Sequence, residues 1–145
     1  MDKMKRFVLL VNNDEDACFL VKDAFEKLDV DARLAYLDDE DALLGYLKSL
    51  DPHTDKNRLP YPDLILLDLN MPAFGSPEAI KAIKSDPRLN SIPIVILAPS
   101  HAEKAALDCY VGANAFIVKP PTFEGLLEVI KSLELFWLHS ITLSN

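Results

Sequence analysis

The sequence predicts an α/β fold: a doubly wound, five-stranded parallel sheet with helices on both faces. Short apolar runs rich in Val, Ile and Leu alternate with stretches of helical period, and no internal repeat interrupts them. Three of the runs are continuously apolar, as parallel strands buried on both faces require. Right-handed crossovers leave few ways to arrange such units, and the strand order 2-1-3-4-5 is the expected one.

Five apolar runs are the expected strands. The second run is more mixed than the others, as an edge strand would be. The runs are Phe7–Val11, Ala32–Tyr36, Leu64–Leu67, Ile94–Leu97 and Ala115–Val118.

The stretches between the strands have the spacing of amphipathic helices, with apolar residues three and four positions apart. A capping-box spacing begins at Ser100, and Thr122 is a candidate N-cap for the last helix. The polar stretch Asp51–Tyr61 is expected to be a surface loop. The expected helices are Glu15–Leu28, Asp41–Leu50, Pro77–Ile83, Ala102–Val111 and a last helix from about Thr122 through Leu133 and beyond.

Size and charge limit the classes of protein to which the chain can belong. At 145 residues, the chain is expected to form one domain spanning residues 1–145. A net charge of -8 argues against binding to nucleic acid or to anionic membranes. The apolar stretch Phe7–Val11 is too short for a signal peptide or a membrane span, so we expect a cytoplasmic protein.

The cysteines and histidines give no sign of a metal site. Cys18 and Cys109 fall among apolar residues of expected helices, where buried free thiols are common. His53, His101 and His139 lie far apart in the sequence. None of these residues has the spacing of a zinc site.

Polar residues stand where the central strands end. Asn12 and Asn13 follow the first strand, Asp68 the third and Lys119 the fifth, whereas the apolar Ala98 follows the fourth. In a sheet of this topology, the carboxyl ends of the strands converge on one cleft. We therefore expect the carboxylate of Asp68 to face the lysine.

The segment Leu64–Pro72, together with Lys119 before a proline, resembles the receiver domain of two-component response regulators. The resemblance covers essentially the whole chain and implies the flavodoxin-like receiver fold. It implies that Asp68 accepts a phosphoryl group from a histidine kinase or phosphotransfer protein, assisted by Lys119. The chain would then be a stand-alone signalling module and not an enzyme, beyond assisting its own phosphorylation and dephosphorylation.

The metal site departs from the family pattern. Receivers carry two acidic residues after the first strand to hold Mg²⁺, and Asn12 and Asn13 stand at the matching positions. The resemblance places the ion at Asn13, Asp68 and Asn70. Mg²⁺ is usually held through carboxylates, so we expect its binding to be weak or absent.

The switch positions of the family also differ. Ala98 stands where receivers carry a hydroxyl residue, and Phe116 matches the switch aromatic without a phenolic group. Two mechanisms remain open. Either Asp68 is still phosphorylated, with weakened dependence on Mg²⁺, or the domain is a non-phosphorylated pseudo-receiver that acts as a docking module.

The C-terminal sequence Leu133–Leu143 is strongly apolar. It would suit a homodimer or a kinase-docking face, or it folds back on the core. A flavodoxin-like enzyme or cofactor carrier is the hypothesis from another class. The sequence argues against it, because no glycine-rich phosphate loop follows the first strand.

Overall fold

The computed structural model describes residues 6–12, 15–30, 32–38, 40–50, 61–68, 78–98 and 115–135. The expectations for Asn13, Asn70, Cys109, the helix over 102–111 and the sequence after residue 135 lie outside these ranges.

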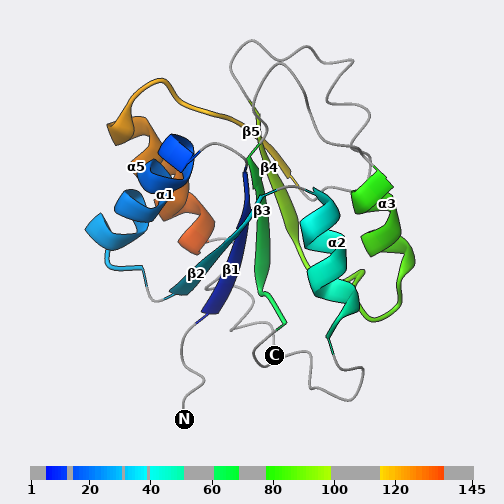
Figure 1. The fold of residues 1–145 in the computed structure, drawn as a ribbon. Coiled ribbons are helices and arrows are strands. Elements are labelled where there is room, and N and C mark those ends of the chain that lie inside the picture. The colour runs from blue at the N-terminus through cyan, green and yellow to red at the C-terminus, as the bar shows by residue number, and fades with distance from the viewer. Residues whose placement is uncertain are drawn as a thin grey trace.

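One parallel sheet runs through the described part of the chain, with five strands in the predicted order β2-β1-β3-β4-β5 (Figure 1). Asp68 and Ala98 are the last residues of their strands and not the first residues beyond them, because Asp68 pairs with Leu97 and Ala98 pairs with Val118. The strands are β1 Arg6–Val11, β2 Ala32–Leu37, β3 Leu64–Asp68, β4 Ile94–Ala98 and β5 Ala115–Val118.

Four helices of the described ranges cover the two faces of the sheet. The helices α1 and α5 lie on one face, and α2 and α3 lie on the other (Figure 1). The expected N-cap is present, because the Thr122 side chain accepts a bond from the Gly125 amide. The helices are α1 Glu15–Lys27, α2 Glu40–Lys48, α3 Glu78–Ser85 and α5 Phe123–Leu133.

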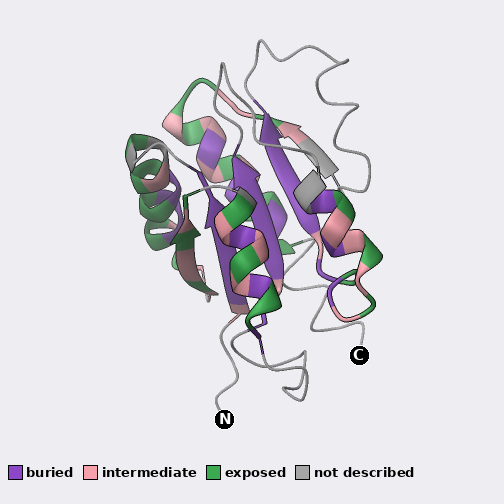
Figure 2. Ribbon diagram, turned by 45° about the vertical axis from the view of Figure 1, so that its right-hand side comes forward, coloured by how far each residue is buried: buried purple, intermediate pink, exposed green. Residues whose placement is uncertain are grey.

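Alternate side chains of each central strand enter different cores. In β1, Leu9 and Val11 pack beneath α2 and α3, whereas Val8 and Leu10 pack beneath α1 and α5. Every residue of β3 and β4 is buried, which Figure 2 shows as continuous purple arrows. This two-sided burial explains why their sequences are apolar without alternation. The strand β2 lies at the edge of the sheet, as its mixed sequence predicted, and it combines half-buried with exposed residues.

The amino-terminal edge of the sheet is held together by polar side chains. The Asp63 carboxylate accepts a bond of 2.8 Å from the Phe7 amide. The Lys84 ammonium donates to the carbonyls of Asn90 and Ile92 at 3.3 and 3.1 Å. Arg88 Nη1 donates to the Leu50 carbonyl at 3.3 Å and to the Tyr61 hydroxyl at 2.9 Å.

Two sequence interpretations need correction. Tyr61, expected at the end of a surface loop, is only 2% exposed and packs in the core. Its burial is possible because Arg88, which is distant in sequence, donates a bond to the hydroxyl. Cys18 is only partly buried and packs at the margin of the core beneath α1 and α5.

Among the helices of the described residues, none combines the length and the hydropathy that crossing a membrane requires.

Candidate functional site

Neighbouring strands bring the candidate residues to one edge of the sheet. The register pairs Val11 with Leu67, so Asn12 and Asp68 stand side by side at the ends of β1 and β3. Lys119 follows Val118, the last residue of β5. The parallel order of the strands thus gathers residues from distant parts of the sequence, as expected.

Asp68 and Lys119 form an ion pair at this edge. Lys119 Nζ lies 2.8 Å from Asp68 Oδ1. The Asp68 side chain is fully buried, whereas the Lys119 side chain is 25% exposed. A buried carboxylate is costly unless it is paired, so the lysine offsets the charge of Asp68 within the sheet. The prediction that the Asp68 carboxylate faces Lys119 is confirmed.

Backbone contacts on both sides of Lys119 fix its position. Its amide donates a bond of 2.6 Å to the Ala98 carbonyl, which extends the ladder between β4 and β5 by one residue. Pro120 and Pro121 follow, and Thr122 then caps α5 in an extended conformation. The side chains of Leu126, Ile130 and Leu133 anchor α5 in the core. Lys119 is therefore held between the sheet and a docked helix.

Asn12 places a neutral amide beside Asp68. The residue is 5% exposed, and its backbone amide donates to the Leu37 carbonyl at 3.0 Å. On the α1 side, the Cys18 thiol lies 4.0 Å from the Asn12 carbonyl. Asn12 is thus built firmly into the edge of the sheet, but it adds no charge to the site.

Among the described residues of the site, Asp68 is the one that could give a divalent cation a charged oxygen ligand. Asp68 offers the hard oxygen ligand that Mg²⁺ prefers. However, the Lys119 ammonium already balances its charge, and Asn12 contributes none. Within the described ranges, no group of three or more His, Cys, Asp or Glu side chains is arranged to hold a metal. The other expected ligands, Asn13 and Asn70, lie outside those ranges.

Of the two expected switch residues, Ala98 and Phe116, the structure describes the side chain of Ala98 alone. Ala98 is 1% exposed, and its methyl group packs in the core beneath α2 and α3. It offers a backbone carbonyl to Lys119 and no hydroxyl to the cleft. Phe116 lies in β5 opposite Ile96, and its side chain is outside the described part of the structure.

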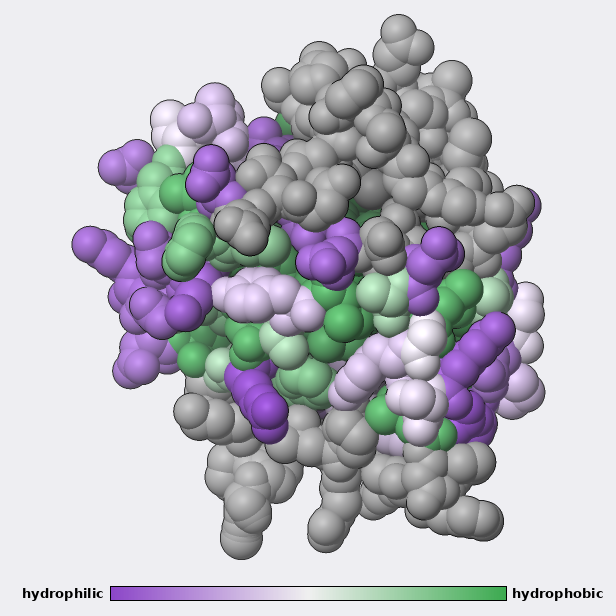
Figure 3. Space-filling model, in the orientation of Figure 1, coloured by the Kyte–Doolittle hydropathy of each residue, from purple (hydrophilic) through white to green (hydrophobic). Residues whose placement is uncertain are grey.

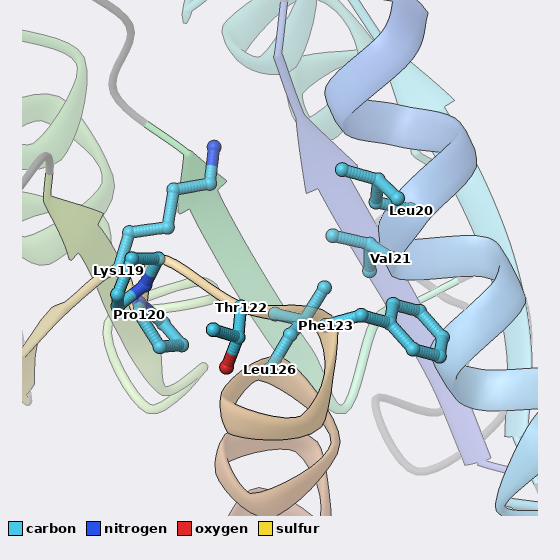
Figure 4. A pocket seen from close by; sticks show the side chains of 8 residues that line it. Leu20, Val21, Lys119, Pro120, Thr122, Phe123 and Leu126 are labelled. Atoms are coloured by element: carbon cyan, nitrogen blue, oxygen red, sulfur yellow. The ribbon is translucent and has the colours of Figure 1, made fainter.

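A small cavity beside Lys119 was not predicted. It has a volume of about 110 Å³ and lies between α1 and the start of α5. Figure 4 shows Leu20 and Val21 of α1 facing the segment from Lys119 to Phe123. Next to it, α1 presents apolar side chains to the surface, because Phe19 is 61% and Leu20 49% exposed. Figure 3 shows such apolar surface among the charged side chains on the α1 side of the molecule.

Comparison with known proteins gives consistent matches over nearly the whole chain. A family model described as the response regulator receiver domain matches residues 8–131. Response regulator Rcp1 from Synechocystis sp. (strain ATCC 27184 / PCC 6803 / Kazusa) is 31% identical over 139 residues, covering 95% of this chain and 92% of the relative.

Solved structures agree with this match. The phosphorylated cyanobacterial phytochrome response regulator RcpA superposes with a TM-score of 0.74 at 31% identity, covering 94% of this chain and 96% of that one. The Mn²⁺-bound form of Rcp1 superposes with a TM-score of 0.71, also at 31% identity, covering 92% and 94% of the two chains.

Proposed function

This chain belongs to the response regulator receiver family of two-component signalling, and on that premise we propose that Asp68 is its phosphoryl acceptor. The observation that carries the proposal is the ion pair between the fully buried Asp68 carboxylate and Lys119. Receiver domains interact with histidine kinases or phosphotransfer proteins, so the proposed donor is a phosphohistidine of such a partner.

The proposed reaction is a phosphoryl transfer between side chains. An Asp68 oxygen forms a bond to phosphorus while the bond from phosphorus to the imidazole nitrogen of the donor breaks, and the imidazole takes up a proton. Catalysis of such transfers rests on positioning and on cations near the equatorial oxygens. Lys119 supplies one such cation at 2.8 Å from the acceptor. The domain thus assists its own phosphorylation without acting on other substrates.

The proposal includes weak dependence on Mg²⁺. Receiver domains bind a divalent cation, and Rcp1 was crystallised with Mn²⁺. In this chain, Asp68 would hold the ion with Asn13 and Asn70, and the ion would neutralise charge on the phosphoryl group. The neutral Asn12 and the charge of Lys119 both reduce the attraction for a divalent ion.

Phosphorylation is tested with acetyl phosphate and Mg²⁺ on the whole chain, followed by intact-mass measurement. The expected result is a mass gain of one phosphoryl group. The gain should be absent from the Asp68→Asn variant, which has nearly the same size and no nucleophilic carboxylate. A gain that persists in Asp68→Asn would assign the acceptor to another residue.

The weak metal site is tested with Asn12→Asp. This change restores one carboxylate beside Asp68, and it should raise the affinity for Mg²⁺ by about tenfold or more, measured by titration calorimetry. Asn12→Ala is the matched control, because it removes the amide without adding charge. Equal affinities in Asn12→Asp and in the parent chain would contradict the placement of Asn12 at the metal site.

A docking module without phosphorylation is the second candidate function. The observation that favours it is that two positions near Asp68 lack the groups of the family pattern, since Asn12 adds no negative charge and Ala98 no hydroxyl. This function predicts no mass gain at any Mg²⁺ concentration. It also predicts that binding to the partner kinase is the same for the parent chain and for Asp68→Asn.

We also propose self-association through the C-terminal region. Leu135, just beyond α5, is 61% exposed, and the sequence that follows it is apolar. Leu135→Glu should lower the mass measured by light scattering if this region joins two copies.

The net charge of -8 supports partners other than nucleic acid and anionic membranes. A donor phosphorylated from ATP implies a cytoplasmic location.

A further inference from the structure

We propose that Gly125 is a positioning residue for Lys119, acting through Pro120. The inference rests on the proposed function in one respect only, which is that Lys119 serves the chemistry of Asp68. The positioning itself is a property of the unphosphorylated protein. It concerns the first turn of α5 and the segment that joins it to β5.

The absence of a side chain at Gly125 lets the helix approach Pro120 closely. A Cβ atom built at Gly125 would lie 2.6 Å from Pro120 Cβ and 3.2 Å from Pro120 Cγ. It would also lie 3.2 Å from Thr122 Oγ1, which accepts the capping bond from the Gly125 amide. Any other residue at this position must therefore displace its neighbours.

Pro120 is the neighbour that has to move, and it cannot do so alone. Its Cβ belongs to a ring that is closed on the backbone nitrogen, so no rotamer change takes this atom out of the way. Displacing the atom displaces the backbone of Pro120. That backbone is joined directly to Lys119, whose ammonium lies 2.8 Å from Asp68.

The other contacts of the segment leave room for such a movement. The Lys119 amide is fixed to the Ala98 carbonyl at 2.6 Å, so a shift at Pro120 turns the residue about this anchor. The cavity of about 110 Å³ between α1 and this segment leaves part of its surface without packing. Figure 4 shows Lys119 and Pro120 on one side of this cavity and Leu20 and Val21 of α1 on the other. The contact with Gly125 is thus the support on the α5 side.

Gly45 provides a matched control within the same chain. It also lies inside a helix, α2, but a Cβ atom built there meets nothing within 4 Å. Gly125→Ala and Gly45→Ala make the same chemical change and give the same gain in helix propensity. They differ in the contact with Pro120.

The test uses the full-length, unphosphorylated protein with ¹⁵N-labelled lysine and follows the side-chain ammonium signal of Lys119 by NMR. The signal is assigned by its loss in Lys119→Arg. Gly125→Ala should shift or broaden it, and Gly45→Ala should leave it unchanged. An unchanged signal in folded Gly125→Ala would overturn the proposal.

Second-site variants separate positioning from a general loss of structure. Pro120→Gly removes the proline atoms that an alanine at position 125 would strike and leaves only the longer approach to Thr122 Oγ1, so Gly125→Ala should shift the Lys119 signal little in that background. Pro120→Ala keeps the Cβ, and Gly125→Ala should still disturb the signal there. Equal disturbance in both backgrounds would overturn the proposal. Should Gly125→Ala fail to fold, Pro120→Gly alone must shift the Lys119 signal, and an unchanged signal would count against it.

Phosphorylation is a separate readout on the same variants. Displacement of a catalytic group by about 1 Å can cost up to about a hundredfold in rate, so we expect Gly125→Ala to accept phosphoryl groups from acetyl phosphate roughly tenfold more slowly. The Lys119→Ala background should abolish this difference. A parent chain that gains no mass refutes the proposed function, whereas the NMR result alone decides the positioning.

Discussion

At the amino-terminal edge of the sheet, charged side chains bond mainly to the backbone, whereas at the carboxyl-terminal edge a buried carboxylate is paired with a lysine. Asp63 and Lys84 each bond to main-chain groups of neighbouring segments, and Arg88 joins a carbonyl to the Tyr61 hydroxyl. Asp68 and Lys119 instead meet across the end of β4. The first arrangement holds chain segments together, and the second places two opposite charges face to face at the end of the sheet.

The comparison predicts that charge at the carboxyl-terminal edge serves the chemistry, and that charge at the amino-terminal edge serves only stability. Measuring both the phosphorylation rate and the free energy of unfolding of the same variants tests whether the two ends of the sheet have these separate roles.

The largest effect is expected for Lys119→Met. It leaves the fully buried Asp68 without its lysine, and removing one partner of a buried pair typically costs about 3–5 kcal/mol. Because Lys119 is 25% exposed, we expect a smaller loss of about 2–3 kcal/mol in urea denaturation, together with much slower phosphorylation. The double variant Asp68→Asn/Lys119→Met should recover most of the stability. Parent-like stability of Lys119→Met would mean that the pair does not govern the energetics of this edge.

An intermediate effect is expected for Arg88→Ala. The variant loses the bonds to the Leu50 carbonyl and the Tyr61 hydroxyl, so the free energy of unfolding should fall by about 1–2 kcal/mol. Tyr61→Phe removes only one of these bonds and should cost about 1 kcal/mol. Neither change should alter the phosphorylation rate of the folded protein. A slower rate would show that the two edges of the sheet are coupled.

The smallest effect is a pH dependence that comes from Lys84. Burial lowers the pKa of this ammonium from its ordinary value of 10.5, so the folded protein releases the proton at lower pH than the unfolded chain does. The unfolded chain then binds more protons just below pH 10.5, and the free energy of unfolding rises with pH in that window.

The measurement compares parent and Lys84→Met in urea denaturation between neutral pH and pH 10.5. The difference between the two proteins should shift in favour of the parent as pH rises. Burial raises the pKa of Tyr46 from its ordinary value of 10.0, which lowers the stability of the fold as pH rises through that value, but this contribution is common to both proteins and cancels in the difference. A constant difference across the window would refute the assignment to Lys84.

The sequence predicted the sheet well, because strands buried on both faces leave apolar runs that local patterns reveal. It also predicted the meeting of Asp68 and Lys119, since parallel strands bring their carboxyl ends together. Tyr61 was misjudged because its hydroxyl depends on Arg88, a partner that no local pattern connects with it. The contact between Gly125 and Pro120 was missed for a similar reason. A glycine inside a helix signals a constraint, but only the packing of α5 shows which neighbour imposes it.

The place of β5 in the sheet bears on how steadily Lys119 stays beside Asp68. Among the described strands β5 pairs with β4 alone, and edge strands open locally at a lower free energy than the centre of a fold. Each local opening that breaks the bond from the Lys119 amide to Ala98 also draws the ammonium away from Asp68, while β1, β3 and β4 stay paired. Amide hydrogen exchange at Lys119 therefore reports how often Asp68 loses its lysine in a protein that is otherwise folded.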